Sequence, residues 1–380
     1  MHRKRLAGPI QEAVDAWLNS LEAPLVGGTE RWREDLIDSA PRRFTVYEPM
    51  VLLPAGSFND DAWKAELRSR DADSVAALWM GILREVKVRR GGATILTHLA
   101  VNEAIPRHHG PRGEENILRA PTQLRVLWGD FGDDEHHQGK ESFDSALWVS
   151  TKQNGIVQTW APRWTMFSRG NVKEKARLLR FTTSTTTEGT RWAVDLYAGI
   201  GYFAFSYVAR GMRVLCWEIN AWSVEGLRRG ARANGWRVRV VGSRELELRG
   251  GLDGVLAGGE DIVVFHESNE GALGRVLQLH SMGVVRGVEH VNCGLLPTSE
   301  ASWDSAWRMA SLWAGSCWLH LHENVSVDDI EDRRRHVQRR MNGWGEAEGG
   351  RKSTVEHVER VKTFAPGVWH CVFDVHVAAD

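Results

Sequence analysis

The stretch VDLYAGIGYFAF, Val194 to Phe205, decides the fold of this chain. A short apolar run ends in Asp195, passes through the turn Gly199-x-Gly201 and continues into an aromatic segment compatible with a helix. A buried strand, a glycine loop and a helix in this order are typical of the first unit of a nucleotide-binding sheet. The stretch therefore predicts a loop whose backbone approaches a nucleoside.

A second acid supports this prediction. Glu218 follows the apolar run 214–217, where an acid binds ribose hydroxyls. Three interpretations remain open: a loop that binds adenosylmethionine, a loop that binds a nicotinamide or flavin dinucleotide, and a purely structural turn. The second is possible because Gly199-x-Gly201-x-x-Ala204 satisfies the loose dinucleotide fingerprint. Asp195 favours adenosylmethionine, since an acid at that place in the adenosylmethionine-dependent transferases fixes the loop and reaches the methionine end.

The composition is that of a globular protein with nearly balanced charge. The chain has 380 residues, 42% of them hydrophobic and 26% charged, with a formal net charge of −1. Composition therefore lacks the basic excess typical of nucleic-acid-binding proteins. The four cysteines form no C-x-x-C pair, and no apolar stretch approaches the roughly 20 residues that span a bilayer. We expect a cytoplasmic protein with reduced cysteines and no membrane insertion.

Strands and helices alternate regularly in the C-terminal half. Strand-like runs begin near residues 192, 213, 237, 262, 288 and 317, helix-like segments separate most of them, and two further runs close the chain. This order predicts an α/β fold of the class I adenosylmethionine-dependent transferase type. Such a fold has a Rossmann-like, doubly wound, seven-stranded sheet, here with an antiparallel edge and preceded by a smaller α+β domain.

The chain is expected to divide into three parts. We predict an N-terminal unit at 1–73, an α+β middle domain at 74–165 that is a candidate for tRNA contact, and a Rossmann-like catalytic domain at 166–380. A threonine-rich run at 182–189 is expected to be a flexible connection, although it is also compatible with a strand.

In an open α/β sheet, ligands bind outside the carboxyl ends of the strands. Three places should therefore line one pocket: the loop 197–201, Glu218 with Asn220, and the segment Asn292 to Pro297. Two groups of that segment are candidates for orienting a flat base beside a reactive sulfonium. They are the side-chain carbonyl of Asn292 and the backbone that Pro297 stiffens. A simple loop cap explains Asn292 equally well.

A polar segment, Met166 to Lys175, precedes the predicted sheet. It combines Ser168, Asn171 and three cations, groups that suit the carboxylate and amine of an amino acid such as the methionine end of adenosylmethionine. The alternative is a helix N-terminus capped by Ser168 or Asn171, with solvated lysines. The residues by themselves favour this alternative.

Other motifs give little sign of chemistry. The histidine pairs 108–109 and 136–137 lack a third ligand at metal-binding spacing, and neither a Gly-x-Ser-x-Gly elbow nor a phosphate loop occurs. We therefore expect no metal. Arginine clusters at 228–232 and 333–340 are interpreted as solvated helix faces, or as phosphate contacts if the substrate is RNA.

Eight ordered segments together resemble one family, the tRNA wybutosine-synthesising aminocarboxypropyltransferases, which are relatives of the tRNA guanine-N1 methyltransferases. The segments are Tyr47–Met50, Thr97–Asn102, Trp128–Gly132, Gln153–Ile156, Trp160–Asn171, Val194–Phe203, Val291–Glu300 and Val358–His370. The resemblance covers most of the chain from about residue 44 onward.

The resemblance implies a specific reaction. Such enzymes move the 3-amino-3-carboxypropyl group of adenosylmethionine, and not its methyl group, onto a carbon of 4-demethylwyosine beside the anticodon of tRNA(Phe). Methylthioadenosine leaves. It also implies a tRNA partner and no obligatory protein partner. The sulfonium has three electrophilic carbons, so positioning selects the product. A guanine-N1 methyltransferase, and a tRNA-binding protein that has lost catalysis, remain as alternatives.

The resemblance also assigns residues. Ser168 and Lys175 match the residues at the methionine moiety and Glu218 the residue at the ribose. The family usually has an Asp-Asn pair near the adenine, shortly after the next strand; Gly242-Ser243 stand at the matching place. The predicted set comprises the cofactor-binding residues Ser168, Lys175, Asp195, Gly199, Gly201, Glu218, Gly242 and Ser243, the positioning residues Asn292 and Pro297, and the RNA-binding residues Arg169, Asn171 and Lys173.

Overall fold

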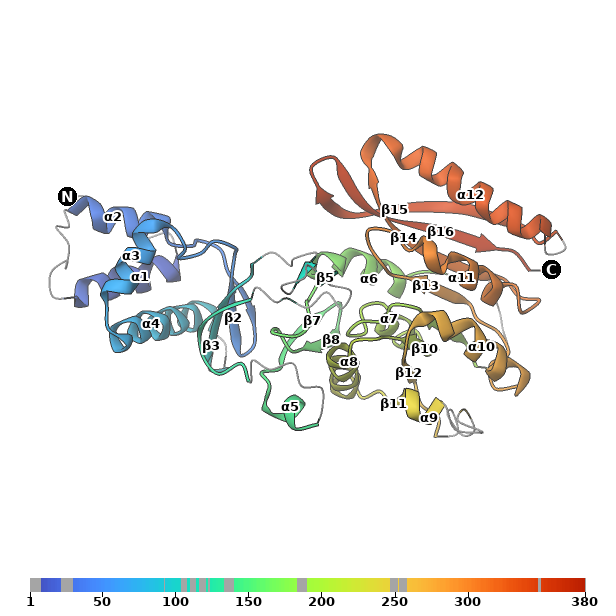
Figure 1. Cartoon of the computed structure of the whole chain (residues 1–380), viewed down its shortest axis with the longest axis horizontal. Coiled ribbons are helices and arrows are strands. Elements are labelled where there is room, and N and C mark those ends of the chain that lie inside the picture. Colours follow the sequence, from blue (N-terminus) through green and yellow to red (C-terminus); the bar gives the residue numbers. More distant parts are fainter. Residues whose placement is uncertain are drawn as a thin grey trace. The chain divides into compact units, whose positions relative to one another are not determined.

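The computed structural model (Figure 1) describes residues 8–21, 30–91, 93–103, 108–109, 114–115, 121, 124–132, 140–182, 190–246, 252, 258–347 and 350–379. The chain forms two compact units: Met1–Thr151 with Ala161–Met166, and Lys152–Trp160 with Phe167–Asp380. The stretches expected to form the N-terminal unit and the middle domain thus belong largely to the first unit. The division into three domains stays a prediction.

The first unit is an α+β unit with a four-stranded sheet in the order β1-β2-β3-β6. Its strands are β1 (Thr45–Tyr47), β2 (Met50–Leu53), β3 (His98–Val101) and β6 (Arg125–Trp128), and its helices are α1 (Pro9–Ser20), α2 (Glu30–Ser39), α3 (Asp61–Ser69), α4 (Ala72–Arg90) and α5 (Lys140–Ser145). Side-chain caps start two of the helices: Asp60 accepts from the Trp63 N–H and Asp71 from the Ser74 N–H, each at 2.8 Å. The two-residue strands β4 (His108–His109) and β5 (Glu114–Glu115) pair with each other.

The second unit is built on an eight-stranded sheet in the order β11-β12-β10-β9-β13-β14-β16-β15 (Figure 1). The parallel strands are β9 (Trp192–Asp195), β10 (Arg213–Trp217), β11 (Val238–Gly242), β12 (Ile262–His266), β13 (His290–Cys293) and β14 (Cys317–Ser326). The antiparallel pair β15 (Ser353–Ala365) and β16 (Val368–Val377) closes one edge. The hairpin of β7 (Val149–Gln153) and β8 (Ile156–Trp160) packs through β8 on α8.

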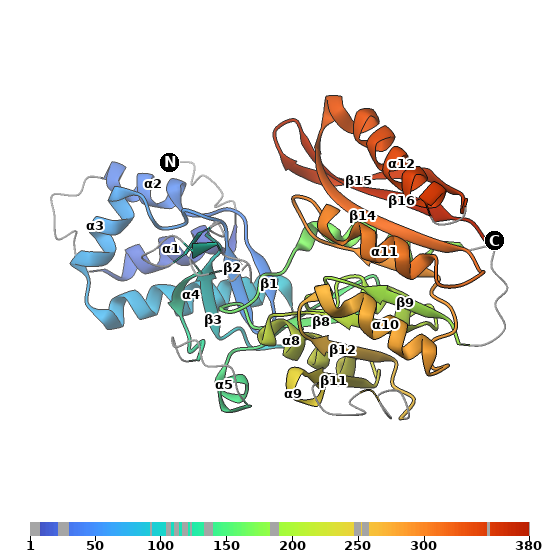
Figure 2. The ribbon, with the colours of Figure 1, turned by 45° about the vertical axis from the view of Figure 1, so that its right-hand side comes forward.

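Helices cover both faces of this sheet because successive strand residues point to opposite sides. The two faces have separate cores, one containing Val194, Trp217 and Phe265, the other Ala193, Cys216 and Val264. On the first face lie α10 (Ala272–Ser281), α11 (Trp303–Ala310) and α12 (Ile330–Ala347); on the second lie α6 (Val172–Leu179), α7 (Ala204–Val208) and α8 (Ala221–Ala233). Figure 2 shows α12 running along β15 and β16.

The predicted doubly wound sheet with an antiparallel edge is confirmed, but the expected seven strands are eight. The strand-like run near residue 237 forms the edge strand β11, which pairs with the outer side of β12. Within the described ranges no helix is long and apolar enough to cross a membrane. Most of the threonine-rich run and the histidine pair 136–137 lie outside the described residues.

Candidate active site

The glycine loop follows β9 as the sequence predicts. Gly199 and Gly201 have positive φ angles of 52° and 85°. A Cβ at Gly201 would collide with the ring of Phe205, and one at Gly199 would lie 3.0 Å from the ring of Tyr202. Only glycine satisfies both the backbone conformation and the space at these two positions. At Gly199 and Gly201 the loop backbone therefore has no side chains, and it lies at the carboxyl edge of the sheet.

Glu218 ties this loop to the next helix. Its Oε2 accepts from the Gly199 N–H and its Oε1 from the Asn220 N–H, both at 2.8 Å. Asn220 in turn caps α8 by accepting from the Trp222 N–H at 3.0 Å. Loss of water raises the pKa of Glu218, and the backbone donors oppose that shift. The predicted ribose ligand thus stands beside the loop.

Asn292 is a strand residue rather than a loop cap. It lies fully buried in β13, and its Nδ2 donates to Oδ1 of the equally buried Asp195 at 3.1 Å. The same Asp195 oxygen accepts from the Tyr197 N–H at 3.3 Å. The second oxygens, Asp195 Oδ2 and Asn292 Oδ1, have no hydrogen-bond partner among the described residues. The two side chains therefore connect β13 with the end of β9 and the start of the glycine loop.

Pro297 lies exposed after β13 in a segment anchored to β14. The Leu296–Pro297 peptide is cis, and the Pro297 carbonyl accepts from the Asn324 N–H at 2.7 Å. Glu323 Oε1 accepts from the Thr298 hydroxyl at 2.8 Å and from the Ser299 N–H at 2.9 Å. The loop around Pro297 is thus fixed by contacts from β14.

Ser168 and Lys175 come together beside the glycine loop. The Ser168 N–H donates to the Tyr202 hydroxyl at 3.1 Å. Lys175 is 5% exposed; its Nζ donates to Gln158 Oε1 at 2.6 Å and to Gln153 Oε1. Burial, and then the charge of Lys362, lowers the pKa of Lys175 to about 7. Asn171 directly precedes α6, as the alternative predicts, but the side chains of Ser168 and Asn171 make no capping hydrogen bond.

These residues fit a nucleoside joined to an amino acid. Lys175 has amide oxygens as partners and no ion pair with a carboxylate of the described chain. A buried ammonium without a counter-charge is costly, so the place suits an anionic group. Glu218, near the glycine loop, supplies acceptors for hydroxyl groups. Adenosylmethionine presents both kinds of group.

The three predicted RNA-binding residues have different surroundings. Arg169 is exposed. Asn171 is buried, and its Oδ1 accepts from the Ser168 hydroxyl at 3.2 Å. Lys173 is exposed and forms an ion pair with Glu359 at 2.5 Å. Arginines of both predicted clusters, among them Arg228, Arg229, Arg333, Arg334 and Arg335, form ion pairs with acids.

In the structure, the segment that follows β12 lies next to the end of β10, where Gly242-Ser243 were expected. The strand beside β10 is β12, and β11, which ends at Gly242, lies one strand farther out. The strand that follows β10 in the sequence is thus not its neighbour in the sheet, because β12 lies between β11 and β10. Ser243 begins the short helix α9 (Ser243–Leu246). A cofactor role for these two residues stays a prediction.

Residues 266–269, at the end of β12, border the site and were missed. The Glu218 N–H donates to the Phe265 carbonyl at 3.2 Å, and Asn269 Nδ2 donates to the Leu196 carbonyl at 3.0 Å. His266 Nε2 lies 3.2 Å from the Ile219 carbonyl. The signal was available in the sequence, since the polar run His-Glu-Ser-Asn directly follows a buried strand.

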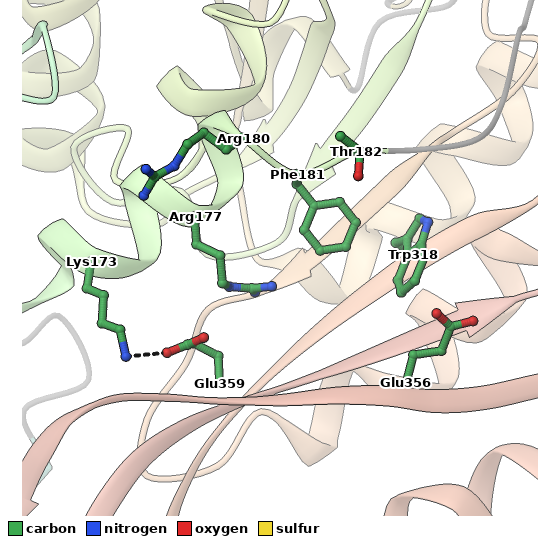
Figure 3. A pocket seen from close by; sticks show the side chains of 8 residues that line it. All are labelled: Lys173, Arg177, Arg180, Phe181, Thr182, Trp318, Glu356 and Glu359. Atoms are coloured by element: carbon green, nitrogen blue, oxygen red, sulfur yellow. Dashed lines mark ion pairs between the residues drawn. The ribbon is translucent and has the colours of Figure 1, made fainter.

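A hollow of about 790 Å³ lies between α6 and the antiparallel edge of the sheet (Figure 3). Its lining comprises Lys173, Arg177, Arg180, Phe181, Thr182, Trp318, Glu356 and Glu359. Arg177 is paired inside the protein with Glu174 and Asp374, and Lys173 with Glu359. Because two of its three bases, Lys173 and Arg177, are paired with acids, this hollow is a weaker candidate for an anionic ligand than the surroundings of Lys175.

Comparison with known proteins gives consistent relatives. The chain is 40% identical to tRNA wybutosine-synthesizing protein 2 of Schizosaccharomyces pombe, over 88% of this chain and 72% of the relative. It is 34% identical to the protein of the same name from Saccharomyces cerevisiae, over 90% and 75%. No protein-family model matches the chain.

Solved structures show the same fold. The crystal structure of Pyrococcus horikoshii TYW2 in complex with MeSAdo matches with a TM-score of 0.56 and 15% identity, over 98% of this chain and 100% of that one. Trm5b from Pyrococcus abyssi matches with a TM-score of 0.52 and 11% identity, over 94% and 84%. The predicted fold class is thus confirmed. Because the fungal relatives exceed 30% identity over most of both chains, this chain belongs to the tRNA wybutosine-synthesizing protein 2 family.

Proposed function

We propose that this protein transfers the 3-amino-3-carboxypropyl group of adenosylmethionine to 4-demethylwyosine beside the anticodon of tRNA(Phe), releasing methylthioadenosine. Membership of the wybutosine-synthesizing protein 2 family carries this proposal. The arrangement of Glu218 at the glycine loop and of Lys175 in a buried place without a carboxylate partner among the described residues supports it.

The chemistry comes from the co-substrate, whose sulfonium makes the carbons bound to it electrophilic. A bond forms between the base carbon and the γ-carbon of the aminocarboxypropyl chain, the γ-carbon–sulfur bond breaks, and the base carbon loses a proton. The protein selects among three such carbons by holding one of them in line with the nucleophile. Glu218 fixes the nucleoside end, and Ser168 and Lys175 fix the amino-acid end.

We propose further roles for residues around this site. Asn292 and Pro297 position the base, and the exposed residues Arg169 and Lys173, together with the first unit, contact the tRNA. We also propose that the protein acts in the cytoplasm without an obligatory protein partner. Its four cysteines are buried and unpaired, as is usual in reducing compartments.

A double-label assay tests the function. The protein is incubated with tRNA(Phe) that carries 4-demethylwyosine and with adenosylmethionine labelled either in the methyl group or in the carboxyl carbon. We expect only the carboxyl label to enter RNA and the methyl label to appear in methylthioadenosine. Unmodified tRNA(Phe) transcript is the control and should acquire neither label. Methyl label in the RNA would establish a methyltransferase instead.

A further inference from the structure

Lys362, on β15, reaches the predicted methionine site from a distant part of the chain. Its Nζ donates to the Ser168 hydroxyl at 2.7 Å. The lysine side chain passes over Gly170, where a Cβ would stand 3.2 Å from Nζ and would collide with Cδ. The absence of a side chain at Gly170 thus permits Lys362 to approach Ser168.

Two lysines without a carboxylate partner meet at this place. Burial lowers the pKa of Lys362, and the charge of Lys362 contributes to the lowered pKa of Lys175. In the described part of the chain, neither ammonium forms an ion pair with an acid. Lys173 differs, since it pairs with Glu359 at 2.5 Å. Two like charges, one buried and one half-buried, destabilise this place unless an anion joins them.

The position beside the glycine loop identifies the anion. Ser168, which accepts from Lys362, donates its backbone N–H to Tyr202, the residue after Gly201. Gln158, which accepts from Lys175, donates its Nε2 to the Gly201 carbonyl at 3.3 Å. An anion bound by the lysines therefore lies next to the loop that receives the nucleoside, as a carboxylate carried by that nucleoside would.

We propose that Lys362, together with Lys175 and Ser168, binds the carboxylate of the aminocarboxypropyl group, an inference that rests on the proposed function. Anchoring at Glu218 and at this carboxylate holds both ends of the co-substrate. The transferred chain is then stretched between two fixed points, which restricts the direction of its γ-carbon. Lys362 acts here as a binding residue and takes no part in proton transfer.

Calorimetric titration with three ligands tests the inference. Adenosylmethionine has the carboxylate, decarboxylated adenosylmethionine lacks only that group, and methylthioadenosine lacks the whole chain. Each is titrated into the full-length wild-type protein, Lys362→Met and the control Lys352→Met, whose exposed lysine precedes β15. We expect Lys362→Met to bind adenosylmethionine about 10- to 100-fold more weakly, the range for lost hydrogen bonds to a charged group.

The other two ligands make the result specific. Lys362→Met should bind methylthioadenosine and decarboxylated adenosylmethionine like the wild type, which also shows that the variant is folded. Equal weakening for all three ligands, or unchanged preference for the carboxylate, overturns the inference. So does weaker tRNA binding with unchanged adenosylmethionine binding, which would assign Lys362 to a phosphate. A wild-type protein that binds none of the three overturns the proposed function itself.

Discussion

Asn292 and Asp195, 97 positions apart in the chain, join neighbouring strands through a bond of 3.1 Å from Nδ2 to Oδ1. Burial raises the pKa of Asp195 to about 6, against a hydrogen bond from Asn292 that lowers it. A carboxyl pKa that is higher in the folded state means that the folded protein binds more protons between about pH 4 and 6. Stability from this group is therefore lost as pH rises through that window, and its charge opposes folding at neutral pH.

Asp195→Asn removes this charge while keeping an acceptor for Asn292. We expect the variant to be more stable than the wild type at pH 7.5 by up to about 3 kcal/mol, since one pKa unit corresponds to about 1.4 kcal/mol. The gain should disappear toward pH 4. Urea unfolding at several pH values measures it, with the exposed Asp328→Asn as the control. A gain independent of pH would contradict the explanation.

The lowered pKa of Lys175 predicts that ligand binding depends on pH. Its pKa of about 7 means that the free protein loses this charge as pH rises above neutrality. Binding of a carboxylate then requires proton uptake, so adenosylmethionine should bind more weakly at pH 8.5 than at 6.5. Titrations in buffers of different ionisation enthalpy measure the uptake. Lys175→Met should lack it, and the difference between the two proteins separates Lys175 from the ligand's own amine.

Lys175 also predicts how stability depends on pH. A lysine pKa that is lower in the folded state leaves the unfolded chain with more protons between about pH 7 and 10.5. The free energy of unfolding should therefore rise with pH in that window for the wild type. Unfolding curves of Lys175→Met should show a smaller rise. Equal slopes for both proteins would mean that Lys175 keeps its proton in the folded state throughout that window, which would contradict the lowered pKa.

Gly201→Ala should destabilise the protein through two effects. The backbone has φ of 85°, and the new methyl group would collide with the ring of Phe205. Gly235 offers a matched control, because its φ is 80° but no atom lies within 4 Å of the place that a Cβ would take there. We expect Gly235→Ala to cost about 1–2 kcal/mol and Gly201→Ala about 3 kcal/mol or more. Chemical unfolding measures both, and equal losses would contradict the predicted collision.

We expect substitutions at the end of β12 and at the end of β11 to have different effects on adenosine binding. Asn269 contacts the Leu196 carbonyl beside Glu218, whereas Ser243 follows the edge strand. We expect Asn269→Ala to weaken methylthioadenosine binding by about tenfold, the effect of one or two hydrogen bonds. Ser243→Ala should leave it unchanged. The reverse result in calorimetry would restore the role predicted for Gly242-Ser243.

Local patterns in the sequence predict the central part of the fold. The strand, glycine loop and helix from Val194 onward, the acid at Glu218 and the antiparallel closing pair all follow from short-range apolar periodicity and glycine placement. Strand order is a long-range property. Nothing near Val238 indicates that its strand pairs with the outside of β12, so the distance of Gly242-Ser243 from the end of β10 could not be predicted.

The tertiary contacts around the lysines of the candidate site could not be predicted from the sequence. Ser168 and Lys175 lie seven residues apart on one segment of the sequence, whereas Lys362 reaches Ser168 from β15. Likewise, the ion pair between Lys173 and Glu359 joins α6 to β15. This tertiary pairing decides which lysine is neutralised by an acid and which one keeps its charge for a ligand.

The passage of Lys362 over Gly170 also has a consequence for the history of the family. Because a side chain at residue 170 would block the path that Lys362 takes to Ser168, we expect substitutions at the two positions to be correlated. An alignment of the fungal relatives should therefore show them changing as a pair. A relative with a bulky residue at the first position should have a short residue at the second.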